Sequence, residues 1–192
     1  VISVICRCWL TQCFAQLGVF KDGIPIAETG IRIAEESEHA YSLAYAYCSL
    51  GFLLLVKGDL ELAIRALKRS QKICESSEIR VLTTHVGSNL GYAYALAGHL
   101  DDAMPLMEKA EAQSELIGRK AAWSMRLTWL GQACLLAGQI DPAREHGQRA
   151  LALATDAGER GHQAWALKLL GDVVQERSPD LAQARSYYDQ SM

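Results

Sequence analysis

A Leu-Gly pair recurs along this 192-residue chain at a constant spacing of 40 residues. The four pairs begin at Leu50, Leu90, Leu130 and Leu170. A fixed period of roughly 20 to 50 residues indicates an array of similar units that stack on one another. The period predicts a single repeat domain of five units, with approximate boundaries 1–38, 39–78, 79–118, 119–158 and 159–192.

Each unit has the pattern of two helices. Apolar and small residues before the second glycine follow the 3 and 4 spacing of one helix face, and no alternating strand pattern is present. A second glycine follows the first by seven residues, at Gly58, Gly98 and Gly138. Glycine accepts the left-handed backbone that ends many helices. We therefore expect an all-α fold, an α-α superhelix or solenoid of about five helix-turn-helix repeats.

The glycine of each Leu-Gly pair lies inside a predicted helix, where it costs roughly 0.5–1 kcal/mol relative to alanine. An alanine follows at twelve residues in three units and at thirteen in the last. Two small residues that face each other allow two helices to approach closely, which offsets that cost. The predicted structural pairs are Gly51 with Ala63, Gly91 with Ala103, Gly131 with Ala143 and Gly171 with Ala184.

This pattern resembles the tetratricopeptide repeat (TPR), whose signature is W-x-x-L-G-x-x-Y followed by small and apolar residues in a second helix. The third unit matches best, at Gly87, Leu90, Gly91, Tyr94, Ala103, Met107 and Ala110. The resemblance covers essentially the whole chain, and the period of 40 instead of 34 implies longer helices. Stretches such as "LGYAYALAGHLDDAMPLMEKA" also resemble the C-terminal repeat tail of bacterial class III nucleotidyl cyclase/AAA-type ATPase signalling proteins.

In TPR proteins the first helix of each repeat lines a concave groove that holds the ligand. The resemblance therefore implies a ligand-binding stripe, which mixes aromatic and polar side chains: Tyr45, Phe52, His85, Asn89, Tyr92, Met125, Trp129, Gln132, Trp165 and Lys168. Such a stripe suits an apolar or amphipathic peptide or helix. The alternative is that several of these side chains pack between units. Lysine and arginine are rare in the stripe, which disfavours an acidic C-terminal tail as ligand.

Other classes of function lack support in the sequence. The formal net charge of −3 and the pI near 6.0 argue against nucleic acid as a partner. No uninterrupted apolar run reaches the roughly 18 residues of a membrane span. Phosphate-loop, dinucleotide and zinc-protease motifs are missing, so we expect no enzyme, cofactor or metal. The six cysteines form no C-x-x-C pair and are expected to be small core residues in a reducing cytoplasm.

The sequence thus predicts a non-catalytic protein-interaction scaffold, as a regulatory tail or fragment of a larger bacterial signalling protein. A small-molecule sensor module of a multidomain ATPase regulator is the alternative. End units of a repeat array need polar outer faces, and neither end of this chain has an evident cap. We therefore also expect self-association through the ends, where Tyr187, Tyr188 and Met192 would lie.

Overall fold

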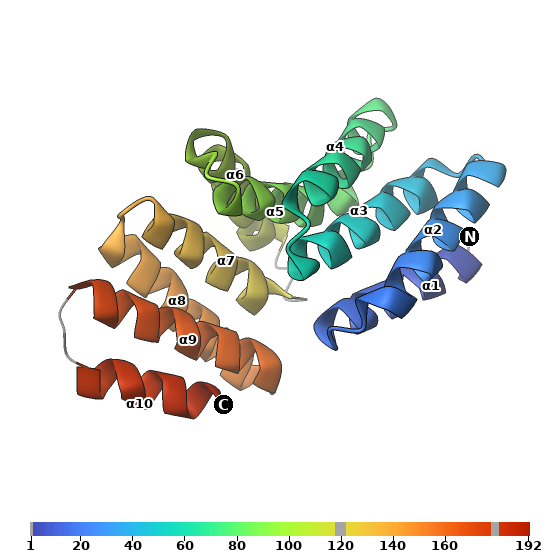
Figure 1. Cartoon of the computed structure of the whole chain (residues 1–192). Coiled ribbons are helices and arrows are strands. Elements are labelled where there is room, and N and C mark those ends of the chain that lie inside the picture. Colours follow the sequence, from blue (N-terminus) through green and yellow to red (C-terminus); the bar gives the residue numbers. More distant parts are fainter. Residues whose placement is uncertain (1, 118–121, 178–180) are drawn as a thin grey trace. The chain divides into compact units, whose positions relative to one another are not determined.

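The computed structural model describes residues 2–117, 122–177 and 181–192, which form ten α-helices and no β-strand (Figure 1). The all-α fold expected from the repeat pattern is therefore confirmed. In chain order the helices are α1 (Ile2–Gln16), α2 (Phe20–Glu36), α3 (Ala40–Lys57), α4 (Leu60–Ser76), α5 (Arg80–Leu96), α6 (Leu100–Ile117), α7 (Trp123–Leu136), α8 (Ile140–Asp156), α9 (Arg160–Arg177) and α10 (Leu181–Ser191).

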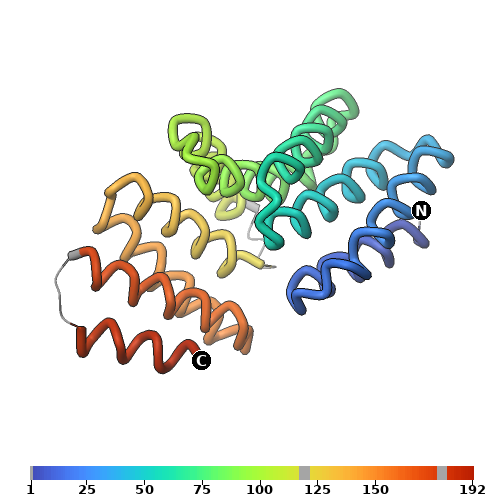
Figure 2. Tube along the Cα trace, in the orientation of Figure 1, coloured from blue at the N-terminus to red at the C-terminus, as the bar shows by residue number. Residues whose placement is uncertain are grey.

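The helices belong to two compact units, which we describe separately. Unit 1 spans Val1–His99 and holds α1 to α5, and unit 2 spans Leu100–Met192 and holds α6 to α10. In unit 1, α3 is central and contacts α1, α2, α4 and α5. In unit 2, α9 contacts α7, α8 and α10. Figure 2 shows how short turns reverse the chain between the two helices of a pair.

Residues with left-handed backbone form the turns of this array. Within the pairs these are Gly18, Gly58, Gly98 and Gly138, so the prediction that glycine ends the first helix is confirmed. Between pairs, the same backbone occurs at Glu38 (φ 49°), Glu78 (φ 54°) and Gly158 (φ 68°). Three of the predicted unit boundaries, at 38, 78 and 158, fall in these turns, and the boundary at 118 lies outside the described residues.

The helix glycines lie where two helices are too close for a side chain. A Cβ atom added at Gly51 would lie 2.5 Å from Cγ of Leu67 and 3.4 Å from the carbonyl oxygen of Ala63. A Cβ atom at Gly131 would lie 3.1 Å from the carbonyl oxygen of Ala143.

The last pair of helices differs, because Gly171 faces a tyrosine ring. A Cβ atom at Gly171 would lie 2.6 Å from Cε1 of Tyr188, which takes the place that we expected for Ala184. Ala184 is nonetheless buried. Gly91 and Ala103 belong to different units, so their proximity stays a prediction.

Helix α3 is the one helix in the described ranges that is long and apolar enough to cross a bilayer, with 18 residues and a mean hydropathy of 1.3. A buried core helix passes the same test. In α3, 56% of the residues are buried, and four neighbouring helices surround it. Its place at the centre of unit 1 therefore explains its composition.

Candidate functional site

The first helices of three predicted repeats, α1, α3 and α5, lie next to one another in unit 1, with α3 in the middle. The Gln12 amide donates to the hydroxyl of Tyr45 (3.3 Å) and to Oγ of Ser49 (3.2 Å). The Asn89 amide donates to Sγ of Cys48 (3.7 Å). Polar contacts therefore join α1 to α3 and α5 to α3, and they include Tyr45 and Asn89 of the predicted stripe.

Three aromatic side chains contact one another next to these polar groups. We call Trp9, Tyr41 and Tyr45 the aromatic cluster. The Trp9 ring meets Tyr45 edge-on at 6.4 Å between centroids, and Tyr41 lies 6.2 Å from Tyr45. The Trp9 side chain is 58% exposed, and it packs against Tyr45, which is 8% exposed. The predicted stripe does not include Trp9 or Tyr41, although Tyr41 precedes Tyr45 by four residues and so shares its helix face.

Tyr45 and the nearby thiols of Cys8 and Cys48 are uncharged at neutral pH, and burial strengthens this preference. Burial raises the pKa of Tyr45 to about 12, although the hydrogen bond from Gln12 opposes the rise. It also raises the pKa of Cys48 to about 12 and that of Cys8 to about 11. The face offers amides, hydroxyls and aromatic rings, a set that suits uncharged peptide segments.

Half of the predicted stripe lies inside the protein. The buried residues are Tyr45, Phe52, Asn89, Tyr92 and Trp129. Trp129 is 1% exposed, so a partner does not reach it without displacing its neighbours. This corrects the expectation of an open groove at these positions, and its cause is that long side chains at the centre of the first helices fill the space between packed helices. His85, Met125 and Gln132 are half-buried, and Trp165 and Lys168 are exposed.

The exposed part of the stripe in unit 2 carries a paired charge. Lys168 Nζ lies 2.7 Å from Oδ2 of Asp172, and the Tyr188 hydroxyl donates to the other oxygen of Asp172 (2.8 Å). Tyr188 lies in the last helix, as expected, and it is half-buried because its ring packs on Gly171. Self-association through the ends stays a prediction. Tyr187 is half-buried, and Met192 is exposed.

A serine, a histidine and a glutamate meet where α7 and α9 begin. Nδ1 of His162 lies 3.0 Å from Oγ of Ser124 and 3.0 Å from Oε2 of Glu159. Burial alone would raise the pKa of Glu159, but hydrogen bonds from Ser124 and His162 hold it below its usual value. A catalytic triad uses both ring nitrogens of histidine, one for each partner. Here both partners share Nδ1, so the cluster links the start of α7 to the start of α9 and lacks the two-sided histidine of a catalytic triad.

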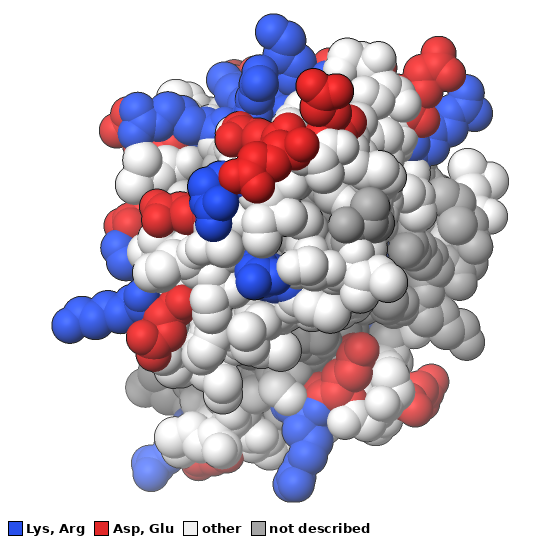
Figure 3. Space-filling model, turned by 90° about the vertical axis from the view of Figure 1, so that its right-hand side faces the viewer, with Lys and Arg blue, Asp and Glu red and all other residues white. Residues whose placement is uncertain are grey.

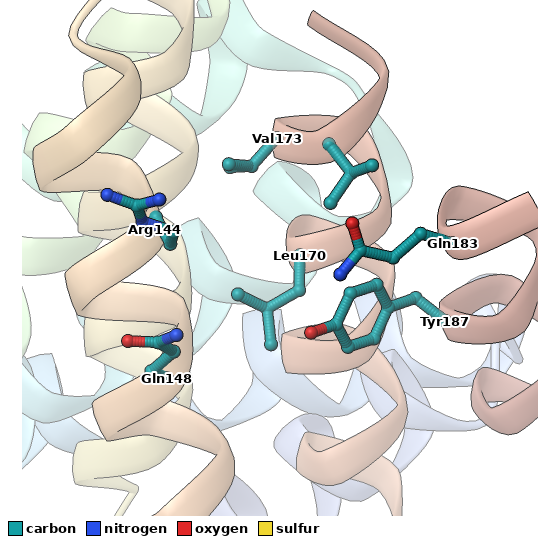
Figure 4. A pocket seen from close by; sticks show the side chains of 7 residues that line it. Arg144, Gln148, Leu170, Val173, Gln183 and Tyr187 are labelled. Carbon is teal, nitrogen blue, oxygen red and sulfur yellow. The ribbon is translucent and has the colours of Figure 1, made fainter. Parts of the chain in front are cut away.

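Unit 2 also contains a cleft between α8, α9 and α10, with a volume of about 340 Å³. Figure 4 shows Arg144 and Gln148 of α8 facing Gln183 and Tyr187 of α10 across it. Leu170, Val173 and Val174 of α9 form the apolar floor. The predicted stripe does not include this cleft, because the polar rim of the cleft comes from second helices.

The cysteines divide into two groups, which corrects the expectation that all six are core residues. Cys8, Cys48, Cys74 and Cys134 are buried, whereas Cys6 and Cys13 are exposed on α1. In the described ranges no group of three metal-ligating side chains comes together.

Comparisons with known proteins agree with the helix-pair architecture. Residues 121–192 match the family model of the tetratricopeptide repeat. A search of curated proteins finds no match. Among solved structures, the nearly identical TPR-like repeats of a protein described as a kinesin light chain from Podosopora anserina align over 98% of this chain and 92% of that one, with a TM-score of 0.66 and 18% identity. A variant of the same protein gives a TM-score of 0.68 at the same identity and coverage.

BtubC (BKLC) from P. vanneervenii aligns over 95% of this chain and 75% of its own, with a TM-score of 0.69 and 17% identity. The chain has the TPR fold. The tetratricopeptide repeats that residues 121–192 match generally mediate protein–protein interactions. In TPR terms, the aromatic cluster belongs to the first helices of the repeats, and the cleft lies between the second helices of the last two.

Proposed function

We propose that this TPR chain is a non-catalytic scaffold that binds an apolar or amphipathic peptide segment on the first-helix face of unit 1. The exposed Trp9 ring, held against the buried Tyr45, is the observation that carries the proposal. Aromatic side chains are enriched where proteins bind each other, because one rigid group contributes a large contact area. Trp9 is such an anchor, and Tyr41 extends the same surface.

The chemistry of the partner follows from the neutral groups around this anchor. Gln12 and Asn89 are amides that are already bonded to their neighbours, and they leave the face without a fixed charge of their own. Apolar side chains of the peptide would contact Trp9 and Tyr41. An acidic tail is disfavoured, because Lys168, the lysine of the predicted stripe, is paired with Asp172 in unit 2.

Selection of peptides from a random display library tests this proposal. Peptides that bind the chain should be rich in apolar residues. Trp9→Ser or Tyr41→Ser should lower the affinity of these peptides about tenfold or more, as expected for a partly exposed aromatic anchor. Trp165→Ser, an exposed tryptophan on α9, serves as the matched control and should leave binding unchanged. Peptides that bind all four proteins equally would contradict the proposal.

The proposed place of this chain in a larger protein rests on the sequence. The resemblance of the sequence to the repeat tails of bacterial signalling proteins supports a role as a regulatory tail or fragment of such a protein, in the cytoplasm. Exposed thiols at Cys6 and Cys13 fit a reducing compartment. The net charge of −3 supports a protein partner over nucleic acid, and the packing of α3 inside unit 1 supports a chain that acts away from the membrane.

The cleft of unit 2 supports a second candidate, a small-molecule sensor. Its volume of about 340 Å³ lies within the range of ligand pockets, and its floor is apolar. Two amides and Arg144 lie on the rim, and a small carboxylate would share the Arg144 guanidinium with Asp141, which lies 2.7 Å from it. A thermal-shift series with aliphatic and aromatic monocarboxylates tests this candidate. Stabilisation that depends on Arg144, and that disappears in Arg144→Met, would favour the sensor. A melting temperature that stays the same with every carboxylate would exclude small carboxylates as ligands of this cleft.

A further inference from the structure

Helix α3 begins at a histidine cap. The residue before its first turn is His39, whose backbone is extended (φ −95°, ψ 97°) and whose side chain accepts a hydrogen bond from the backbone N–H of Ser42. The acceptor is Nδ1, which lies 3.2 Å from that nitrogen and 3.0 Å from the Ser42 hydroxyl oxygen. Serine, threonine, aspartate and asparagine are the usual residues at this position. A histidine in their place makes the cap depend on the charge of its ring.

The bond fixes where the imidazole carries its proton. A backbone N–H can only donate, so Nδ1 supplies a lone pair and the ring proton of neutral His39 lies on Nε2. The Ser42 hydroxyl rotates and can donate to the same lone pair. When the ring takes up a second proton, Nδ1 becomes a donor and the acceptor is lost. The ring then also places a positive charge at the N-terminus of α3, which the helix dipole disfavours.

No other helix start whose cap the structure describes uses such a bond. The residues in the same place before α2, α4, α5, α7 and α8 make no side-chain hydrogen bond to the first turn: Val19, Asp59, Ile79, Ala122 and Gln139. His39 is exposed, so protons of the solvent reach its ring, whereas Ser42 is buried. Loss of the cap would leave the N–H of Ser42 without an acceptor inside the protein, which costs free energy.

The start of α9 has the reverse arrangement at the same positions of the repeat. Glu159 and His162 stand 120 residues after His39 and Ser42, and Nδ1 of His162 lies 3.0 Å from Oε2 of Glu159. A proton on His162 strengthens this contact, because the two side chains then carry opposite charges. Acid therefore acts in opposite directions at the two helix starts: it removes the cap of α3 and tightens the start of α9.

Charged side chains also stand on every element that packs against α3. Figure 3 views the right-hand side of Figure 1, where the turn from α2 to α3 lies, and acidic and basic side chains both gather in the upper part of that face. The charged residues nearest the ends of these elements are Arg7 on α1, Glu36 on α2, Glu75 on α4, Arg80 on α5, and Glu38 and Glu78 in the turns. Among the described residues none forms an ion pair with His39. The cap bond, and not an ion pair, is therefore what a proton on His39 changes.

Tyr41 links this cap to the binding face. Its ring meets the His39 ring edge-on at 6.4 Å between centroids, and it lies in the first turn of α3. We propose that His39 is a proton-sensitive cap: in mildly acidic solution the first turn of α3 loosens, Tyr41 leaves its place beside Tyr45, and the affinity of the face for its peptide falls. The last step rests on the proposed function, whereas the release of the cap does not.

Hydrogen exchange measured by NMR tests the cap without any ligand. Histidine side chains change charge between about pH 5 and 8, so spectra at pH 7.5 and 5.5 compare the two states. The protection factor of the Ser42 amide, which corrects for the pH dependence of the exchange chemistry, should fall about fivefold at pH 5.5, as expected for the loss of a typical cap. At pH 7.5 the nitrogen shifts of the imidazole should place its proton on Nε2. A proton on Nδ1 at pH 7.5 would overturn the proposal.

His39→Asn supplies the matched control, because the amide oxygen of asparagine caps a helix and does not titrate. In this variant the Ser42 amide should have the same protection at both pH values. His162→Gln, which removes the histidine at the start of α9, should follow the parent chain at Ser42. Equal loss of protection in the parent and in His39→Asn would show that acid acts elsewhere, and it would overturn the proposal.

Peptide affinity at the two pH values tests the step from the cap to the binding face. A display-selected peptide without histidine or acidic residues should bind the parent severalfold less tightly at pH 5.5, and it should bind His39→Asn equally at both. Equal affinity of the parent at both pH values, with protection of Ser42 lost, would overturn this step. A chain from which no peptide is selected would contradict the proposed function, and the Ser42 amide would still decide the cap.

Discussion

Gly131 illustrates how one residue decides the spacing of several helices. A Cβ atom there would lie 2.6 Å from Leu169 of α9, 3.2 Å from Cβ of His146 and 3.1 Å from the backbone of α8. The atom of α8 is the carbonyl oxygen of Ala143, which belongs to the backbone and cannot rotate away as a side chain can. The glycine therefore sets the closest approach of α7 to both neighbours, and its helix-propensity cost is offset by that packing.

Gly131→Ala should lower the free energy of unfolding by about 1–3 kcal/mol, because the added methyl overpacks the crossing. Gly161→Ala is the control, since Gly161 lies in α9 with no atom within 4 Å of an added Cβ. There the higher helix propensity of alanine should give a gain of up to about 1 kcal/mol. Urea melts of both variants measure the two effects. Equal effects in both variants would contradict the packing explanation.

His146 of α8 lies at the same crossing and predicts a pH dependence. Burial lowers the pKa of its imidazole below 6.5, and the charge of Arg149 lowers it further, whereas Glu145 and Glu108 act in the opposite direction. The unfolded chain therefore binds a proton more readily than the folded chain. This residue costs stability as the pH falls from about 6.5 through the lower folded pKa.

The free energy of unfolding should therefore fall less between pH 7.5 and 5.5 in His146→Gln than in the parent chain. Urea melts at the two pH values give the comparison. A parent and a His146→Gln variant with the same change would show that His146 does not titrate differently in the folded state.

At the scale of elements, the turns between helix pairs need a residue with left-handed backbone, and either glycine or glutamate takes that position. Gly158 has the left-handed backbone after α8, and Glu38 and Glu78 have it after α2 and α4. A residue with a side chain costs roughly 1–2 kcal/mol in this conformation, whereas glycine does not. The two glutamates are therefore local sites of strain in unit 1.

Glu78→Gly should raise the free energy of unfolding by up to about 1 kcal/mol, because relief of strain exceeds the extra freedom that glycine gives the unfolded chain. Glu75→Gly, three residues earlier inside α4, should lower it by about 1 kcal/mol. Thermal melts of the pair separate backbone strain from loss of charge. Destabilisation by Glu78→Gly would mean that the side chain contributes more than its backbone conformation costs.

The same element scale shows what the sequence could and could not predict. Helices, turns and the glycine crossings follow from local spacing, which repeats every 40 residues and so can be compared with itself. Burial at Trp129 could not be predicted, because it depends on which neighbours reach a given face. Trp9 could not be predicted from the register either, because the equivalent position 40 residues later, Ser49 on α3, is buried.

At the scale of the whole molecule, one fold presents surfaces of different chemistry. Unit 1 offers the aromatic cluster, and unit 2 offers the polar groups of Lys168, Asp172 and Tyr188 together with the cleft. In a repeat array each pair of helices mainly contacts its neighbours, so surface residues can differ between repeats while the packing positions stay the same. This separation allows a scaffold to carry a binding face without loss of the fold.

Hydroxyl-radical footprinting with a display-selected peptide tests the central claim, because it reports the solvent exposure of individual side chains. If the first-helix face of unit 1 binds the peptide, oxidation of Trp9 and Tyr41 should fall severalfold at saturation. Oxidation of Trp165 and Met192 in unit 2 should stay constant. Protection of Trp165 or of residues on α4, with Trp9 and Tyr41 unchanged, would contradict the account.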